Sequence, residues 1–411
     1  MQKNKVAIVG LGYVGLPLAL KVSENKDYEV VGFDVDVEKV KGLVGKYNSL
    51  SVSGVPGIID GSEYILICVP TPVKSNNRPD FGPLKNACKT VAAQLEKGQN
   101  VVIESTINPG VCEEVLLPIL EQTGLRGGVD FNLAHCPERI NPGDGRWHVG
   151  NIPRNVGALT VSHAKKTADF YRSFLDDTVT ELSSIKVAEA TKVVENAFRD
   201  INIAYVNELA MSFDAMGIDL IEVLKGASTK PFAFMAHYPG CGVGGHCIPV
   251  DPYYLISRAK KSGFNHSFLK KAREVNNYMP EYTVKLLIEK LKSLKILPGK
   301  VRVGLLGLAY KADVGDMRES PALKIKKLLQ DRSMQVFTYD PCLPLESDKK
   351  SLSDLLKAVD VVVLATAHKE FDVVGPVILK KHGIKLVIDG KNFLDKNAIE
   401  MAGILYKGIG H

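Results

Sequence analysis

The sequence predicts an α/β protein in which two parallel-sheet domains are joined by a helical central domain. Short apolar runs rich in β-branched residues recur in both halves of the 411-residue chain and end in polar or glycine-containing turns, as buried parallel strands do. Between the halves, residues 186–216 contain neither glycine nor proline, which favours a long helix. A chain of this length usually holds two or three domains. We expect domains at residues 1–184, 185–299 and 300–411.

The first domain begins with a strand, a glycine turn, a helix and a second strand. The strand Lys5–Val9 runs into Gly10–Gly15, which has the G-x-G-x-x-G pattern, and the strand Glu29–Phe33 ends at Asp34. In a dinucleotide site such glycines let the pyrophosphate approach the backbone, and an acid about 20 residues further on binds the ribose hydroxyls. We therefore expect a Rossmann-like NAD-binding domain, with Asp34 favouring NAD over NADP.

Three further strands of this domain end in loops that could line a ligand site. The strands are Tyr64–Val69, Val101–Glu104 and Asn132–Cys136, and the loops are Pro70–Pro72, Ser105–Gly110 and Pro137–Pro142. Ligands of open parallel sheets bind outside the carboxyl ends of the strands. The last strand of the domain is expected at Thr178–Leu182.

A second α/β unit begins near Lys300 and resembles a degenerate copy of the first. Its expected strands are Val301–Gly307, Gln335–Tyr339, Asp360–Ala365 and Leu386–Asp389, and its first helix is Pro321–Gln330. Two α/β domains joined by helices are expected to leave a cleft between them, where a substrate usually binds.

Composition excludes several classes of protein. The net charge is +6 and no dense run of lysine and arginine occurs, so we expect no nucleic-acid partner. The seven cysteines are irregularly spaced, with no C-x-x-C pair, which predicts neither a zinc site nor a disulfide framework and favours a reducing, cytoplasmic location. The sequence enters a strand within five residues, so we expect no signal peptide. No apolar run reaches the ~18 residues of a membrane helix, so we expect no membrane association.

A glycine-rich loop carries a candidate nucleophile. Cys247 lies within Gly242–Pro252 after three glycines, and Asp251 follows it by four residues. Glycines let the backbone approach a bulky ligand, and a thiol beside an acid can attack an electrophilic carbon. On the expected long helix, Lys192 and Asn196 are four residues apart and therefore share one face.

Taken together, these features resemble the nucleotide-sugar 6-dehydrogenase family, which includes UDP-glucose, UDP-N-acetylhexosamine and GDP-mannose dehydrogenases. The resemblance extends nearly from end to end and rests on Gly10–Pro17, Val69–Pro72, Glu104–Thr106, Pro137–Arg139, Lys192 with Asn196, Gly244–Cys247 with Asp251, Gly307–Lys311 and Arg318–Pro321. It implies a four-electron oxidation of the sugar C6 hydroxyl with NAD. A first hydride transfer gives an aldehyde, the Cys247 thiolate traps it as a thiohemiacetal, a second transfer gives a thioester, and water releases the uronate.

The resemblance also implies roles for single residues. The implied catalytic set is Cys247 as nucleophile, Lys192 stabilising the oxyanion, Asn196 orienting the same oxygen or a water, Asp251 as base for the alcohol step or for hydrolysis, Thr106 holding a water, and Glu138 as the carboxylate for hydrolysis. The implied cofactor-binding set is Gly10, Gly12, Tyr13, Val14, Gly15, Asp34, Lys39, Thr71, Thr106 and Arg318. The implied substrate-binding set is Glu138, Arg139, Lys192, Asn196, His237, Tyr238, Gly244 and Lys311. No metal is implied.

The segment Pro137–Gly143 resembles the branch that oxidises UDP-N-acetylhexosamines, because the glucose-specific enzymes carry a second glutamate where this chain has Pro142. We expect UDP-GlcNAc or UDP-GalNAc as substrate, then UDP-ManNAc. The segment from Asp34 to Pro70 is shorter than is usual in the family, and Cys241 stands where relatives often carry proline. The aliphatic residues of the long helix and of Ala210–Leu224 suggest an exposed apolar helix pair, so we expect a homodimer through the central helices. We also expect a role in polysaccharide biosynthesis.

Other functions stay open at the level of the sequence. One is UDP-glucose 6-dehydrogenase, and another is a two-electron β-hydroxyacid dehydrogenase, which shares the NAD-binding and helical domains but needs neither Cys247 nor a third domain. A third is a non-catalytic nucleotide-sugar sensor, which the set Lys192, Asn196, Cys247 and Asp251 disfavours.

Overall fold

The computed structural model describes residues 3–74, 78–140, 143 and 146–411. Pro142, on which the expected sugar branch rests, lies outside these residues. Within the described part of the chain, no helix combines the length and the apolar character needed to cross a membrane.

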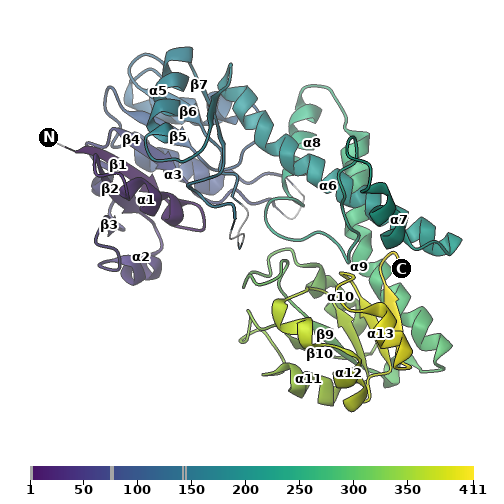
Figure 1. Ribbon diagram of the computed structural model, residues 1–411. Helices are drawn as coiled ribbons and strands as arrows, with labels where there is room; N and C mark the ends of the chain where they lie inside the picture. Colours follow the sequence, from purple (N-terminus) through teal and green to yellow (C-terminus); the bar gives the residue numbers. More distant parts are fainter. Residues whose placement is uncertain (1–2, 75–77, 141–142, 144–145) are drawn as a thin grey trace. The chain divides into compact units, whose positions relative to one another are not determined.

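The chain forms two compact units, and two helices cross the boundary between them (Figure 1). The first unit comprises residues 1–195 and 253–265, and the second comprises residues 196–252 and 266–411. Helix α6 (Ile185–Met216) begins in the first unit and ends in the second, whereas α8 (Asp251–Lys261) begins in the second and ends in the first. The helical region expected as a separate domain is thus divided between the units, and the three-domain division stays a prediction.

The first unit contains an eight-stranded sheet of order β3-β2-β1-β4-β5-β6-β7-β8. The strands are β1 (Asn4–Val9), β2 (Tyr28–Phe33), β3 (Leu50–Ser53), β4 (Tyr64–Ile67), β5 (Asn100–Ile103), β6 (Asn132–His135), β7 (Arg154–Ala158) and β8 (Val179–Glu181). Neighbouring strands are parallel except β6 and β7. The order reverses between β1 and β4, which is where doubly wound sheets bind ligands.

Helices cover this sheet, and alternate residues of its strands face opposite sides. The helices are α1 (Gly15–Ser23), α2 (Val37–Leu43), α3 (Gly82–Ala92), α4 (Leu117–Leu120) and α5 (Val161–Arg172), with a π-helical turn at Cys112–Leu116 leading into α4. Ile8 and Leu66 belong to the apolar cluster on one face, and Ala7 and Ile65 to the cluster on the other. The carboxyl ends of β1, β2, β4, β5 and β6 therefore lie at one edge of a sheet that is buried on both faces.

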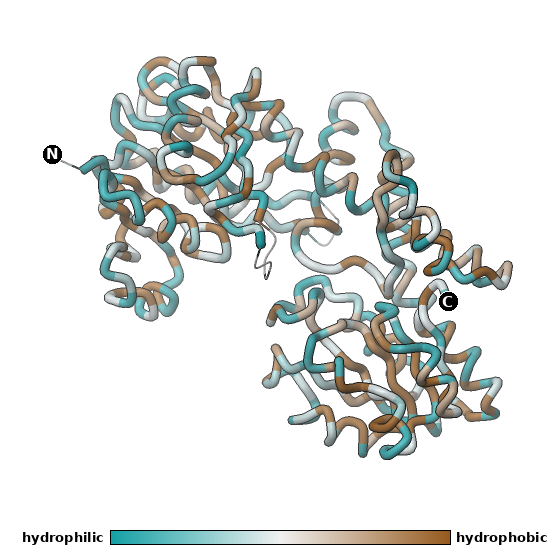
Figure 2. The backbone as a smooth tube through the Cα atoms, viewed as in Figure 1, coloured by the Kyte–Doolittle hydropathy of each residue, from teal (hydrophilic) through white to brown (hydrophobic). Residues whose placement is uncertain are grey.

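The second unit contains a five-stranded parallel sheet of order β10-β9-β11-β12-β13. The strands are β9 (Arg302–Leu306), β10 (Gln335–Tyr339), β11 (Val361–Leu364), β12 (Leu386–Asp389) and β13 (Leu405–Gly408). The helices are α7 (Leu220–Ala227), α9 (Ser267–Ser293), α10 (Pro321–Gln330), α11 (Leu352–Ala358), α12 (Pro376–Lys381) and α13 (Lys396–Met401), besides the end of α6. The sheet strands are strongly hydrophobic (Figure 2), and one face packs on Val206 of α6 and Met279 of α9.

The predicted fold class is confirmed, and most expected strands agree with the structure to within two residues. The sequence analysis did not identify β3, β7, β13 or the long helix α9. Helix α9 contains Pro280, which reads locally as a helix break. Strand β7 begins with the charged Arg154 and runs antiparallel to β6, so its local pattern does not indicate a buried strand.

Candidate active site

The glycine turn between β1 and α1 leaves room for a ligand at one of its three glycines. Gly10 has φ +93°, and a Cβ there would lie 2.9 Å from the carbonyl oxygen of Cys68. A Cβ at Gly15 would lie 1.8 Å from the carbonyl oxygen of Gly10, whereas one at Gly12 would meet no atom within 4 Å. Packing therefore explains Gly10 and Gly15, while Gly12 faces open space where a pyrophosphate can approach the backbone.

Asp34 follows β2 and holds this turn together. One of its carboxylate oxygens accepts the N–H of Leu11 at 2.8 Å and the ammonium of Lys39 at 2.9 Å, and the other accepts the N–H of Asp36 at 2.9 Å. Burial alone would raise the pKa of Asp34, but the hydrogen bonds from Lys39 and from the two backbone groups lower it below the usual value. Asp34 is thus an ionised acceptor beside the glycine turn, and these residues fit NAD.

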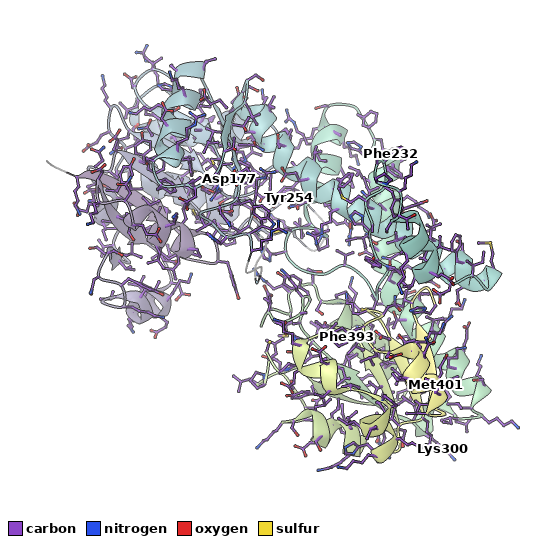
Figure 3. The ribbon with its side chains drawn as sticks, in the orientation of Figure 1. Asp177, Phe232, Tyr254, Lys300, Phe393 and Met401 are labelled. Atoms are coloured by element: carbon purple, nitrogen blue, oxygen red, sulfur yellow. The ribbon has the colours of Figure 1, made fainter. Side chains whose placement is uncertain are left out.

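The loops that follow β4 and β5 are bound to each other. The hydroxyl of Thr71 donates to the carbonyl oxygen of Thr106 at 2.7 Å, and Ser105 donates to the carbonyl oxygen of Val69 at 2.6 Å. The phenol of Tyr254, labelled in Figure 3, donates to the carbonyl oxygen of Thr71. Thr71 and Thr106, both in the expected cofactor-binding set, therefore lie together in the first unit.

Helix α6 anchors the loop that carries Thr106 and presents Lys192 one turn later. The buried carboxylate of Glu189 accepts the N–H groups of Gly110 and Cys112 at 2.5 and 2.8 Å. Burial raises the pKa of Glu189 to about 6, although the two backbone hydrogen bonds oppose the shift. Lys192 is only 8% exposed, and its ammonium has no hydrogen bond or ion pair with the described residues. An enclosed cation of this kind can stabilise a substrate oxygen that gains negative charge.

Glu138 and Arg139 are both engaged within the first unit. Glu138 pairs with the buried guanidinium of Arg154, and its second oxygen accepts the N–H groups of Arg139 and Ile140 at 2.6 and 2.7 Å. The guanidinium of Arg139 lies 2.7 Å from a carboxylate oxygen of Glu195. Arg154 could not be predicted from the sequence, because a single arginine after a proline loop carries no local signal.

In the second unit, the loop that carries Cys247 packs against the loop after β9. The N–H of Gly245, at φ +89°, donates to the carbonyl oxygen of Arg318 at 3.0 Å. A Cβ at Gly244 would lie 2.8 Å from the carbonyl oxygen of Glu319 and from Cβ of Tyr310. Close approach of two backbones therefore requires glycine in this loop.

Cys247, the candidate nucleophile, lies just before helix α8. Its carbonyl oxygen accepts the N–H of Asp251 at 2.8 Å, and its side chain is only partly buried. Burial raises the pKa of each of the other six thiols, which disfavours their reactive thiolate form. These are Cys68, Cys88, Cys112, Cys136, Cys241 and Cys342.

Asn196 and Asp251 lie side by side in the second unit. The side-chain amide of Asn196 on α6 donates to a carboxylate oxygen of Asp251 at 2.5 Å. Asp251 is the first residue of α8 and is only 2% exposed. One continuous helix thus carries Lys192 and, one turn later, the partner of Asp251.

Of the other residues of the expected sets, Tyr13 and Val14 lie in the first unit, and Arg318, His237, Tyr238 and Lys311 lie in the second. Arg318 makes a bidentate ion pair with Asp316, and its side chain is half exposed. The ring of His237 lies 3.1 Å from the carbonyl oxygen of Met235, and Tyr238 is mostly exposed. Their contacts with cofactor or substrate, and those of Lys311, stay predictions.

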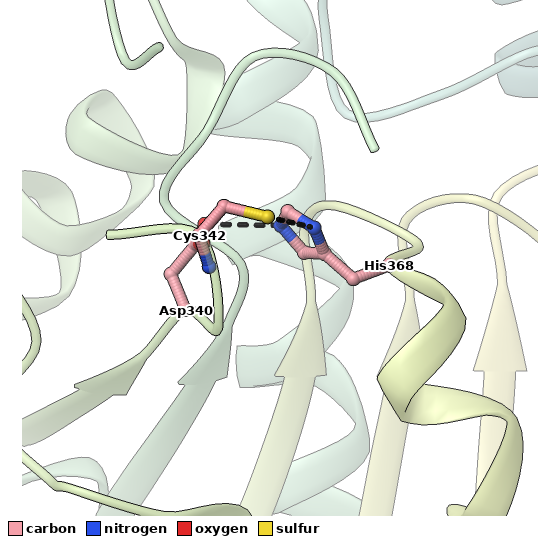
Figure 4. A group of neighbouring side chains, drawn as sticks. All are labelled: Asp340, Cys342 and His368. Atoms are coloured by element: carbon pink, nitrogen blue, oxygen red, sulfur yellow. Dashed lines mark hydrogen bonds and ion pairs between the residues drawn. The ribbon is translucent and has the colours of Figure 1, made fainter. Parts of the chain in front are cut away.

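A cluster in the second sheet that the sequence analysis did not identify joins Asp340, Cys342 and His368 (Figure 4). Nε2 of His368 lies 3.0 Å from Asp340, and its Nδ1 accepts the N–H of Asp313 at 3.0 Å. Asp340 also accepts the N–H groups of Leu308, Ala309 and Cys342 at 2.7–2.8 Å. Both ring nitrogens of His368 and both carboxylate oxygens of Asp340 bind protein groups. The cluster therefore has a structural role: it holds the loops that follow β9, β10 and β11 together.

Comparison with known proteins assigns the chain to a family. Models of the UDP-glucose/GDP-mannose dehydrogenase family match it in three parts: the NAD binding domain at residues 4–50 and 46–175, the central domain at 186–278 and the UDP binding domain at 304–396. A UDP-N-acetyl-D-mannosamine dehydrogenase from Pyrococcus horikoshii is 36% identical over 99% of this chain and 99% of its own length. The chain belongs to the UDP-glucose/GDP-mannose dehydrogenase family.

Further similarities extend over the whole dehydrogenase. A UDP-N-acetyl-D-glucosamine 6-dehydrogenase from Pseudomonas aeruginosa is 36% identical over 98% of this chain and 100% of its own length. The solved structure of the UDP-D-ManNAc dehydrogenase from Pyrococcus horikoshii covers 99% of both chains with a TM-score of 0.91 at 36% identity. The dehydrogenase is therefore an oxidoreductase that uses NAD and acts on a nucleotide sugar, as the sequence analysis predicts.

Proposed function

We propose that this dehydrogenase oxidises the C6 hydroxyl of a UDP-N-acetylhexosamine to the carboxylate, with loss of four electrons. The observation that carries the proposal is the Asn196–Asp251 pair at the start of the helix that directly follows Cys247. A thiol followed four residues later by a base, which an amide from α6 orients, supplies the groups that a covalent oxidation of an alcohol requires. The names of the similar UDP-ManNAc and UDP-GlcNAc dehydrogenases support the amino-sugar class.

In the first oxidation, Asp251 takes the proton of the C6 hydroxyl as a hydride leaves C6. Lys192 stabilises the negative charge that develops on the oxygen, which an enclosed ammonium does effectively. Bound NAD supplies the hydride acceptor in each of the two oxidations. Asn196 keeps Asp251 oriented through the hydrogen bond between their side chains.

In the second half of the reaction, the Cys247 thiolate adds to the aldehyde carbon and the carbonyl oxygen gains a proton. The hydroxyl of this thiohemiacetal then loses its proton to Asp251 as a second hydride leaves C6, giving a thioester. Water then attacks the carbonyl carbon, the C–S bond breaks, and the thiol and the uronate are released. One water is consumed and two hydrides leave C6, so the oxidation state of the product is that of a carboxylate. Asp251 and Glu138 are the carboxylates proposed to serve the hydrolysis.

The test is the number of NADH molecules formed for each sugar consumed. Two NADH per sugar, with uronate as product, support the four-electron reaction, whereas one NADH per sugar and a carbonyl product would show a two-electron dehydrogenase. UDP-GlcNAc, UDP-GalNAc, UDP-ManNAc and UDP-glucose assayed side by side identify the sugar. A kcat/KM for UDP-glucose above that for all three amino sugars would overturn the substrate class.

We also propose that the dehydrogenase forms a homodimer through its central helices. On α6, Val194, Phe198 and Tyr205 are about half exposed and recur at helical spacing, and an exposed apolar stripe of this kind suits a protein interface. Light scattering of the purified protein measures the mass, and Phe198→Glu should shift it toward the monomer. The cytoplasmic location and the role in polysaccharide biosynthesis stay predictions.

A further inference from the structure

The first unit buries an arginine that the proposed mechanism does not use. Arg154, the first residue of β7, is completely buried, and its guanidinium bridges two carboxylates. One nitrogen donates to Glu104 at 2.9 Å, and the other donates to Glu138. The phenol of Tyr171 on α5 donates to the second oxygen of Glu104. These four side chains form one buried hydrogen-bonded network.

Each carboxylate of this network stands beside a residue of the proposed active site. Glu104 directly follows β5 and precedes Thr106 by two residues. Glu138 precedes Arg139, and its second oxygen accepts the N–H groups of Arg139 and Ile140. Because β5 and β6 are neighbouring parallel strands, the arginine ties together the loops that leave their carboxyl ends.

Stability alone is a weak reason for this network. Moving a guanidinium and two carboxylates out of water is costly, and apolar residues of the same volume often stabilise a core as well or better. Burial raises the pKa of Glu104 to about 7, an effect that Arg154 opposes and Glu138 reinforces. What an apolar residue cannot supply is the planar fork, which fixes the spacing and the orientation of two carboxylates at once.

We propose that Arg154 is a positioning residue for the hydrolytic step, because it fixes the side chain of Glu138, the carboxylate proposed for hydrolysis, and the loop that carries Thr106. The proposal rests on the proposed function. Arg154 is fully buried and acts only through Glu104 and Glu138. Loss of the guanidinium that binds both carboxylates should therefore slow the release of the uronate more than it slows the two hydride transfers.

The variants of Arg154 separate the planar geometry of the guanidinium from its positive charge. Arg154→Lys keeps the charge but cannot hold two carboxylates in one plane. Arg154→Met leaves two neighbouring buried carboxylates without a cation and is expected to fold poorly. Arg154→Met combined with Glu104→Gln removes one of those carboxylates, so this double variant should recover much of the lost melting temperature. Arg302→Met, which removes an arginine paired with Asp360 at the start of β9, is the control for the loss of an arginine.

Stopped-flow NADH formation and intact-mass spectrometry measure the two halves of the reaction. In Arg154→Lys, the expected result is a burst approaching two NADH per Cys247, followed by a steady-state rate about 10- to 100-fold below the parent, with the thioester on Cys247 visible as an added mass. The double variant should show the same slow release despite its recovered melting temperature. Arg302→Met should behave as the parent does.

Two outcomes would overturn the proposal. One is a steady-state rate that recovers together with the melting temperature in the double variant, since the network would then serve stability alone. The other is a burst and a steady state in Arg154→Lys that fall by the same factor. The parent enzyme tests the proposed function separately, because one NADH per sugar there would reject the four-electron reaction whatever the variants do.

Discussion

The two sheets contain the same turn, built around Asp34 in the first unit and Asp340 in the second. Each aspartate follows the second strand of its α/β unit and accepts the N–H of the residue after a glycine, Leu11 or Leu308, at 2.7–2.8 Å. The two glycines, at positions 10 and 307, both have a positive φ, +93° and +86°. The second α/β unit therefore repeats the backbone of the first at this point.

The side chains around the two aspartates differ. Asp34 pairs with Lys39, which is partly exposed, and Gly12 of its turn faces open space. Asp340 pairs with His368, which is completely buried (Figure 4). Ala309 occupies the position in the second turn that corresponds to Gly12 in the first. The aspartate binds the backbone in both turns, but Gly12 faces open space, whereas Ala309 is completely buried. The NAD binding and UDP binding models match the two units accordingly.

The largest expected effect comes from removing the second aspartate. Asp340→Ala leaves three backbone N–H groups and His368 without their acceptor, so the free energy of unfolding should fall by about 3–5 kcal/mol. Urea unfolding followed by circular dichroism measures this. Cys342→Ala is the control, because the thiol lies 3.7 Å from His368 and its loss should cost about 1 kcal/mol or less. An equal loss in the free energy of unfolding in the two variants would contradict the structural role of Asp340.

Gly12→Ala should separate folding from cofactor binding. A Cβ at this position meets no protein atom, so the melting temperature should stay near that of the parent. The KM for NAD should rise about 10- to 100-fold, equivalent to about 1.4–2.8 kcal/mol. Gly10→Ala is the contrast, because its strained φ and its contact with Cys68 should lower the melting temperature. An unchanged KM in Gly12→Ala would exclude pyrophosphate from this turn.

Asp34→Asn should weaken NAD binding more modestly. The amide oxygen can still accept the N–H of Leu11, but the ion pair with Lys39 and one acceptor for the ribose are lost. We expect the KM for NAD to rise about 10-fold, or about 1.4 kcal/mol, with kcat nearly unchanged. Steady-state kinetics with NAD and NADP measure the change. If Asp340→Asn raised the KM for NAD equally, the two turns would not differ in function.

The smallest expected effect is a change in how stability depends on pH, and it should be the same for Asp34 and Asp340. In both, burial would raise the pKa, but hydrogen bonds and a cationic partner lower it below the usual value. A lowered pKa in the folded state stabilises the protein above the ordinary aspartate pKa of about 3.9, and this stabilisation is lost as the pH falls through the folded pKa. Urea midpoints between pH 3 and 5 should therefore fall less steeply with acid in Asp34→Asn and Asp340→Asn. If the urea midpoint of either variant fell more steeply with acid than that of the parent, the predicted lowering of the aspartate pKa would be wrong.

Much of the fold and of the candidate site could be predicted because their signals are local. The glycine turn, Asp34 and the strand runs follow from short-range backbone and burial rules. Strand β7 and helix α9 could not be predicted in this way, because a buried arginine and an internal proline contradict those rules. The Arg154 network joins residues separated by up to 67 positions, and no local pattern reports such a distance.

The sequence by itself determined the family, the cofactor and the order of the motifs, since each motif is a short segment whose chemistry is set by neighbouring residues. It also indicated that the second α/β unit echoes the first. Only the tertiary structure decided how each aspartate is used. Asp34 and Asp340 follow equivalent strands. The partner of Asp340, however, is a histidine 28 residues further along the chain. Contacts between such distant segments depend on packing, which no local sequence pattern determines.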